Sequence, residues 1–81
     1  MARYIMVKKM LTARFEIFEH CSITDKTVKA VSEKYNVRIT QLTRGPNYEN
    51  PPLDKILQPK DFIEVLGTFE DVINLYKAAS C

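Results

Sequence analysis

Residues 36–71 read NVRITQLTRGPNYENPPLDKILQPKDFIEVLGTFED and contain two strand patterns, two turns and a helix start. The β-rich run 37–43 is followed by Arg-Gly-Pro-Asn, a strong turn signal because Gly and Asn tolerate positive φ while Pro fixes its own φ. Gln-Pro-Lys-Asp at 58–61 reverses the chain before FIEVL at 62–66, the clearest strand pattern present. Thr-Phe-Glu-Asp at 68–71 is a capping box, which marks a helix start. This order predicts a small α+β domain.

The apolar residues of the first strand pattern predict the direction of its side chains. Strict alternation places Val37 and Ile39 on one face of the strand and Leu42 on the other. Pro51 and Pro52 have no N–H to donate to a β ladder, so their segment is expected to be an edge or a loop. Residues 54–57 are expected to form a short turn of helix.

The part of the chain before residue 36 predicts one more strand and one more helix. RFEIFE at 14–19 alternates between apolar and polar residues, as a half-buried strand does. Ser-Ile-Thr-Asp at 22–25 matches a capping box, and Val28, Val31 and Tyr35 then share one helical face that ends near Asn36, a residue suited to a left-handed cap. The last helix carries its apolar face on Val72, Ile73, Tyr76 and Ala79.

Residues 1–13 are expected to be a lead-in helix or a linker, and residues 14–81 the domain proper. Tyr4, Val7 and Leu11 fall at helical spacing, although residues 4–7 are equally compatible with a strand; we favour the helix. The apolar run there is too short for a signal sequence or a membrane span.

Size and charge narrow the class of protein. A chain of 81 residues forms one domain, and one this short buries only about 60% of its unfolded surface, so we expect a homo-oligomer that adds core at its interface. The net charge is +2, and no stripe of Lys and Arg is present, which argues against direct binding of nucleic acid. Cys21 and Cys81 are far apart and belong to no paired motif, so the sequence predicts free thiols and a cytosolic location.

Residues capable of catalysis or cofactor binding are scarce. The only histidine, His20, neighbours Cys21, and adjacent residues on a strand point to opposite faces, so no metal or nucleophilic site is expected. Two glycines cannot supply a P-loop or a dinucleotide fingerprint, and no cofactor is predicted. The chain is therefore not expected to be an enzyme. Arg44, at a strand end beside Gly45, is the best candidate for an anionic ligand because its planar guanidinium suits phosphate oxygens.

Residues 23–75 resemble the C-terminal regulatory domain of RCK potassium-transport proteins, the TrkA-C domain. The motifs that carry this resemblance are Lys-Thr-Val at 26–28, Arg-Gly at 44–45, Pro-Pro-Leu-Asp at 51–54, Leu-Gln-Pro-Lys-Asp at 57–61 and Gly-Thr-Phe-Glu-Asp at 67–71. Two residues depart from the pattern, since Asp25 and Lys60 occupy positions where the family commonly has glycine. Lys60 indicates either a turn that does not need positive φ or mild strain.

The resemblance implies a βαβββα sandwich of the RCK-C type that dimerises and binds a small regulatory ligand in the groove between protomers. Cyclic di-AMP is the ligand of some family members, and the expected partner is a membrane cation channel or transporter at the inner face of the cell membrane. By family geometry, Arg44 would pair with phosphate while Ile39 and Leu42 pack on adenine. The residues implied to line the groove are Ile39, Thr40, Gln41, Leu42, Thr43, Arg44, Asn47 and Pro51.

Two other functions stay open from the residues alone. The chain could be an assembly module that dimerises without a ligand, within a transporter or a transcription regulator. Regulation through an appended DNA-binding domain is a further alternative, and it requires a domain outside this sequence.

Overall fold

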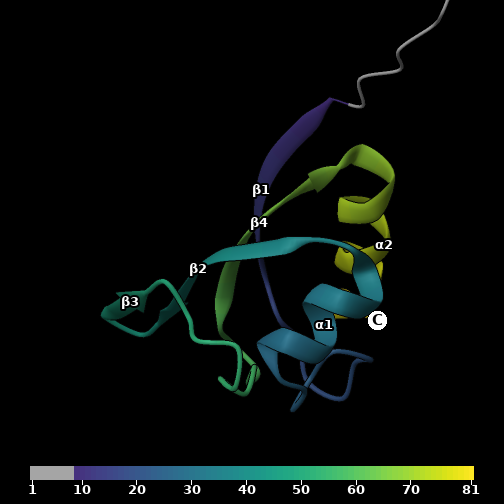
Figure 1. The fold of residues 1–81 in the computed structure, drawn as a ribbon. Coiled ribbons are helices and arrows are strands. Elements are labelled where there is room, and N and C mark those ends of the chain that lie inside the picture. The colour runs from purple at the N-terminus through teal and green to yellow at the C-terminus, as the bar shows by residue number, and fades with distance from the viewer. Residues whose placement is uncertain (1–8) are drawn as a thin grey trace, which may run out of the picture.

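The computed structural model describes residues 9–81, which form a four-stranded antiparallel sheet and two helices (Figure 1). The elements in chain order are β1 (Met10–Glu16), α1 (Val28–Tyr35), β2 (Arg38–Arg44), β3 (Asn47–Glu49), β4 (Phe62–Thr68) and α2 (Phe69–Ser80). This is the βαβββα order of the predicted α+β domain. No helix in the described range is long and apolar enough to cross a membrane.

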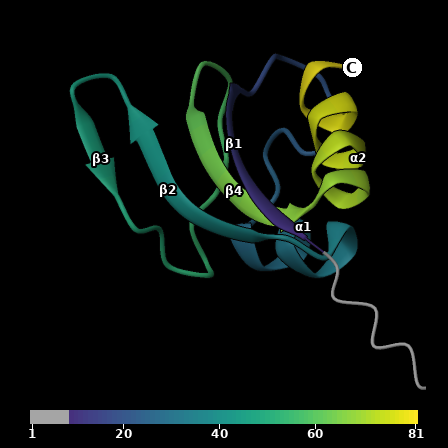
Figure 2. The ribbon, with the colours of Figure 1, turned by 90° about the horizontal axis from the view of Figure 1, so that it is seen from above.

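The sheet is built around β4, and its strand order is β1-β4-β2-β3. β4 pairs antiparallel with β1 on one side and with β2 on the other. Figure 2 shows the β2–β3 hairpin at the end of the sheet farthest from α2. The hairpin therefore extends away from both helices.

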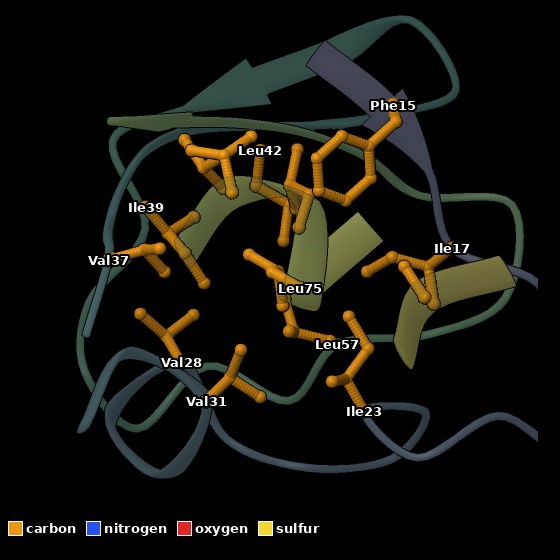
Figure 3. Close-up of a cluster of buried hydrophobic side chains, with 14 residues drawn as sticks. Phe15, Ile17, Ile23, Val28, Val31, Val37, Ile39, Leu42, Leu57 and Leu75 are labelled. Atoms are coloured by element: carbon orange, nitrogen blue, oxygen red, sulfur yellow. The ribbon is translucent and has the colours of Figure 1, made fainter. Parts of the chain in front are cut away.

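One face of the sheet is covered by the helices, with α1 against β2 and α2 against β1 and β4. Side chains from both layers meet there in a core that includes Ile17, Ile23, Leu57, Ile63, Val65 and Leu75, all at most 1% exposed (Figure 3). Fully burying side chains of this size contributes about 1.5–3 kcal/mol each before conformational entropy is subtracted. The opposite face of the sheet carries no element of the described chain, and we call it the open face.

A bulge in β2 sets which of its residues face the core. Thr40 and Gln41 both lie opposite Glu64, because the register with β4 shifts between Ile39 and Gln41. The extra residue turns Ile39 and Leu42 to the same face, where they are 5% and 1% exposed. The prediction that these two residues point to opposite faces was wrong, since it assumed strict alternation.

The start of β1 differs from the sequence prediction. Residues 10–13 belong to the strand rather than to a lead-in helix, because they pair with β4 from Met10 onward in one unbroken register. The helical spacing that includes Leu11 coincides with the period-2 pattern of Leu11, Ala13 and Phe15, which turns all three toward the helices. The rest of the predicted lead-in segment, residues 1–8, lies outside the described residues.

Helix ends test the capping predictions. Thr68 caps α2 by accepting a hydrogen bond from the Asp71 amide, and Asn36 ends α1 in the left-handed region at φ 55°, both as predicted. The predicted helix start at 22–25 was wrong, because α1 begins after Thr27, whose hydroxyl accepts from the Ala30 amide. Residues 22–25 form turns instead: the Thr24 hydroxyl donates to the Phe18 carbonyl and accepts from the Cys21 amide.

Residues 54–57 do not form the predicted turn of helix. Ile56 makes an isolated antiparallel bridge with Thr27. The Val28 amide donates to the Lys55 carbonyl, and the Leu57 amide donates to the Lys26 carbonyl, both at 2.8 Å. Pairing with the segment before α1 thus keeps residues 55–57 out of a helix, and Asp54 belongs to a turn in which the Lys55 amide donates to the Pro52 carbonyl at 3.1 Å.

Cys21 and Cys81 form a disulfide, which corrects the expectation of free thiols. The fold brings the segment after β1 against the end of α2, where the Phe18 amide donates to the Ala79 carbonyl at 2.9 Å. The two Cα atoms lie 5.0 Å apart, although the residues are separated by 60 positions in sequence. Sequence spacing alone carried no sign of this long-range contact.

Candidate ligand site at the β2–β3 hairpin

Arg44 ends β2 and is held by Asp61 in a two-point ion pair. Its Nε and Nη2 each donate to a different Asp61 carboxylate oxygen at 2.8 Å, and Nη2 also donates to the Ile56 carbonyl at 3.0 Å. The Asp61 carboxyl, together with the weaker influence of Glu49, raises the pKa of Arg44, while burial opposes the rise. The guanidinium therefore stays charged, and it fastens the end of β2 to the loop before β4.

Asp61 is the centre of this arrangement. It is 1% exposed, and besides Arg44 it accepts a hydrogen bond from the Gln58 amide at 2.9 Å. Three donors thus satisfy a buried carboxylate, as burial of a charge requires. The Asp61 carbonyl also accepts from the Ile17 amide at 2.8 Å, so the same residue links the hairpin to the end of β1.

The structure divides the predicted ligand residues between the two faces of the sheet. Thr43 lies between Tyr48 of β3 and Phe62 of β4 in register, and Gln41 lies opposite Glu64, so both belong to the open face. Arg44 follows Thr43 and points to the other side, toward Asp61.

Asn47 and Thr40 complete the division. Asn47 is the register partner of Arg44 and shares its side of the hairpin. Thr40 lies on the open face, because its hydroxyl donates to the Glu64 carboxylate at 3.1 Å and to the Glu64 carbonyl. The predicted set therefore forms two groups rather than one continuous strand face.

Three of the predicted residues are buried in the single chain. Ile39 and Leu42 lie in the hydrophobic core (Figure 3), and Pro51 is also buried. Side chains packed against the helices cannot also cover an adenine ring. The expectation that Ile39 and Leu42 contact a ligand is therefore corrected, and the bulge in β2 is the physical reason.

Sequence reasoning missed the aromatic and charged residues of the open face. Tyr48 is 73% exposed and Phe62 is 38% exposed, and the Arg14 guanidinium lies 4.9 Å from the centre of the Phe62 ring. Phe62 was assigned to a strand but not to a face, and only the register with β2 and β1 reveals its neighbours. The sequence places Asp61 in a turn, and its ion pair with Arg44 has no sequence signal beyond the opposite charges.

The described residues form hollows away from the predicted ligand residues. Hollows of about 200 and 210 Å³ lie beside α1 and beside the end of β1, and neither is lined by a predicted ligand residue. Within residues 9–81, no group of three or more His, Cys, Asp or Glu side chains is placed to hold a metal ion.

Comparison with known proteins identifies the fold. The C domain of the potassium-transport protein KtrA, a regulator of conductance of K⁺ (RCK) solved with cyclic di-AMP, superposes with a TM-score of 0.72 at 15% identity, covering 85% of this chain and 82% of that one. The GsuK channel bound to NAD gives 0.67 at 16% identity, and the GsuK RCK domain gives 0.65 at 16%. Both matches cover 88% of this chain but only 14% and 16% of the GsuK chains.

These matches define the class of fold. The chain has the fold of an RCK C-terminal (TrkA-C) domain, as the five sequence motifs predicted. No family model matches the sequence, and no curated protein does. The likeness is therefore one of backbone architecture, carried by turns and strand order rather than by overall sequence identity.

Proposed function

We propose that this chain is a regulatory domain of a potassium or other cation transport system, acting as a homodimer that binds a small anionic ligand such as cyclic di-AMP. The observation that carries the proposal is the match over more than four fifths of both chains to the KtrA C domain solved with that dinucleotide. The matched proteins are the C domain of a regulator of K⁺ conductance, a channel, and the RCK domain of that channel. Ligand binding would bias the attached transporter through different affinities for its two states.

The open face supports pairing with a second copy. Tyr48 and Phe62 lie on either side of Thr43 on this face, at 73% and 38% exposure, and Met10 at 58% lies on the same face at the far end of β1. Exposed apolar side chains gathered on one surface are typical of interaction sites. A small domain gains core when such a face is covered.

The ligand would be held by the exposed part of the predicted set. On one protomer the anionic group would bind on the side of the hairpin where Arg44 and Asn47 offer donors, and Thr40, Gln41 and Thr43 offer hydroxyl and amide groups on the open face, where the second copy would pack. The Arg44 side chain is 37% exposed, and its Nη1 makes no hydrogen bond within the described residues. In the proposed complex a phosphate oxygen would bind at Nη1 while Nε and Nη2 remain on Asp61.

Isothermal titration with cyclic di-AMP, together with native mass spectrometry, tests this proposal. We expect a dimer that binds the dinucleotide, and Asn47→Ala should weaken binding because Asn47 is exposed and bonds to no described side chain. Lys77→Ala on the exposed side of α2 is the matched control and should leave affinity unchanged. No heat for the wild type would remove cyclic di-AMP from the proposal.

Arg44→Ala alone is a poor test of ligand contact, because it also leaves Asp61 buried without its ion partner. Binding to this variant should be calculated from the concentration of folded protein alone, which circular dichroism measures. A ligand that binds only the folded state must stabilise it. If the dinucleotide leaves the melting temperature of the dimer unchanged, the result favours the ligand-free assembly module.

The proposed location is the cytoplasmic side of the membrane, where the transporter would be contacted. Disulfides in that compartment are rare and are mostly transient, catalytic or redox-sensing. The Cys21–Cys81 bridge is therefore the feature that the proposed function does not explain.

A further inference from the structure

The Cys21–Cys81 bridge joins the segment after β1 to the residue that follows α2. Both sulfur atoms lie near the Glu19 carbonyl oxygen, at 3.3 Å for Cys21 and 3.7 Å for Cys81. The Phe18 amide bonds to the Ala79 carbonyl beside them. The bridge thus closes a contact that the backbone already makes.

The bridge is accessible to a reductant. Cys21 is partly exposed and Cys81 is exposed, so neither sulfur is enclosed by the core. Thiol–disulfide exchange requires a thiolate to reach one sulfur directly, and access is one of the factors that set its rate. A bridge at this position differs from a structural disulfide that is sealed within a core.

The described contacts hold α2 in place without the bridge. Val72, Leu75 and Ala79 anchor the helix in the core at 3%, 0% and 0% exposure. The Phe18–Ala79 hydrogen bond lies beside the bridge and involves neither cysteine. After reduction the domain would keep its core, and the two thiols would stay close enough to close again.

We propose that Cys21 and Cys81 form a reversible redox latch on the end of α2, an inference that rests on the cytoplasmic location in the proposed function. A thiolate of a dithiol reductant attacks one sulfur and releases the other cysteine as a thiolate, which takes up a proton. The second thiol of the reductant then displaces the remaining cysteine, and the reductant leaves as a disulfide. The domain gains two electrons and two protons, which the reductant loses.

The latch lies one short segment away from the candidate ligand site. Ile17, which precedes Phe18, donates its amide to the Asp61 carbonyl, and its own carbonyl accepts from the Lys60 amide, both at 2.8 Å. Asp61 in turn holds Arg44. Opening the latch frees the segment after Ile17 first, while the pairing of β4 with its neighbours stays intact.

Hydrogen exchange on the wild-type domain, with cysteine alkylation read in parallel by mass spectrometry, tests the latch. In glutathione disulfide we expect both cysteines to resist alkylation. In dithiothreitol both should be alkylated, and at a labelling time of seconds amide exchange should rise about tenfold or more at residues 18–24 and 79–81 while β4 stays protected. Removing dithiothreitol and restoring glutathione disulfide should reverse the change.

The Cys21→Ser/Cys81→Ser variant is the control, and its exchange should match the reduced wild type in both buffers. Three results would overturn the latch: cysteines that alkylate fully under oxidising conditions, a bridge that native dithiothreitol treatment leaves intact, or reduction that leaves β4 unprotected at that same short labelling time. The last result would make the bridge a staple for the whole fold. Hydrogen exchange and alkylation require neither the dinucleotide nor the dimer. Failure of the ligand proposal can therefore be told apart from failure of the latch.

Discussion

Removing Arg44 should destabilise the domain more than removing Asp61, although the two residues share one ion pair. The asymmetry follows from burial, since the Asp61 side chain is 2% exposed and the Arg44 side chain is 37% exposed. Arg44→Ala leaves a buried carboxylate with one hydrogen bond from Gln58, and an uncompensated buried charge costs about 3–5 kcal/mol. Asp61→Ala leaves a guanidinium that water can reach. The loss of stability should then be about 1.5–3 kcal/mol, the contribution of hydrogen bonds to a charged group.

The double variant Arg44→Ala/Asp61→Ala should recover part of the loss. With the carboxylate gone, no buried charge is left unpaired, so the double variant should be more stable than Arg44→Ala alone. An interaction energy of about 2 kcal/mol is expected for residues in direct contact. For a chain of 81 residues the total free energy of unfolding is about 4–12 kcal/mol, so these differences are large enough to measure or to unfold the single variant.

Urea unfolding followed by far-ultraviolet circular dichroism, at one protein concentration, measures all four proteins of this cycle. Glu49→Ala is the matched control, because it breaks the more exposed ion pair with Lys55 and should cost less than about 1 kcal/mol. The reasoning is refuted if Arg44→Ala costs no more than Glu49→Ala, or if the losses from the two single variants simply add.

Backbone conformation, packing and the cross-link give three more expected outcomes. Lys60→Gly should raise the melting temperature by a few degrees, while Lys60→Ala should not. Lys60 has a φ of 72°, and glycine removes the steric cost of that conformation, about 1–2 kcal/mol, which exceeds the cost of about 0.5–1 kcal/mol from the greater chain entropy of glycine. Gly67→Ala should lower the free energy of unfolding in urea by about 1–3 kcal/mol, since its Cβ would meet the Val37 Cγ1 at 3.1 Å, and adding Val37→Ala should relieve the clash. The free energy of unfolding in urea should be about 4 kcal/mol higher for the oxidised domain than for Cys21→Ser/Cys81→Ser, which is the loop-closure value for a separation of 60 residues. A difference under about 1 kcal/mol would contradict stabilisation by loop closure.

The sequence predicted those parts of the fold that depend on local chemistry. The β-rich runs at 37–43 and 62–66 became strands, and the Thr68 and Asn36 caps lie where a hydroxyl and a left-handed residue are needed. The bulge at Thr40 could not be read from the run itself, because it appears only when β2 is laid against β4. That one missed residue reversed the expected direction of Leu42 and placed it in the core.

The candidate site was predictable as a region but not as a surface. Arg44 was recognised from its residue type and its place before Gly45, yet its partner comes from a turn 17 residues later. The disulfide was missed for the same reason, since its cysteines meet only after β1 and α2 have packed. Both features depend on long-range contacts, which one sequence does not display.

The two positions that depart from the family pattern show how the fold tolerates the loss of glycine. Asp25 and Lys60 have φ of 66° and 72°, so the backbone keeps a left-handed conformation that favours glycine. Each amide makes a 2.8 Å hydrogen bond to a distant carbonyl, Asp25 to Leu57 and Lys60 to Ile17. Tertiary bonds therefore hold both turns against local preference, and of the two readings that Lys60 allowed, mild strain is the correct one. The turn at Lys60 also positions Asp61, so the strain lies directly beside the ion pair that fixes Arg44.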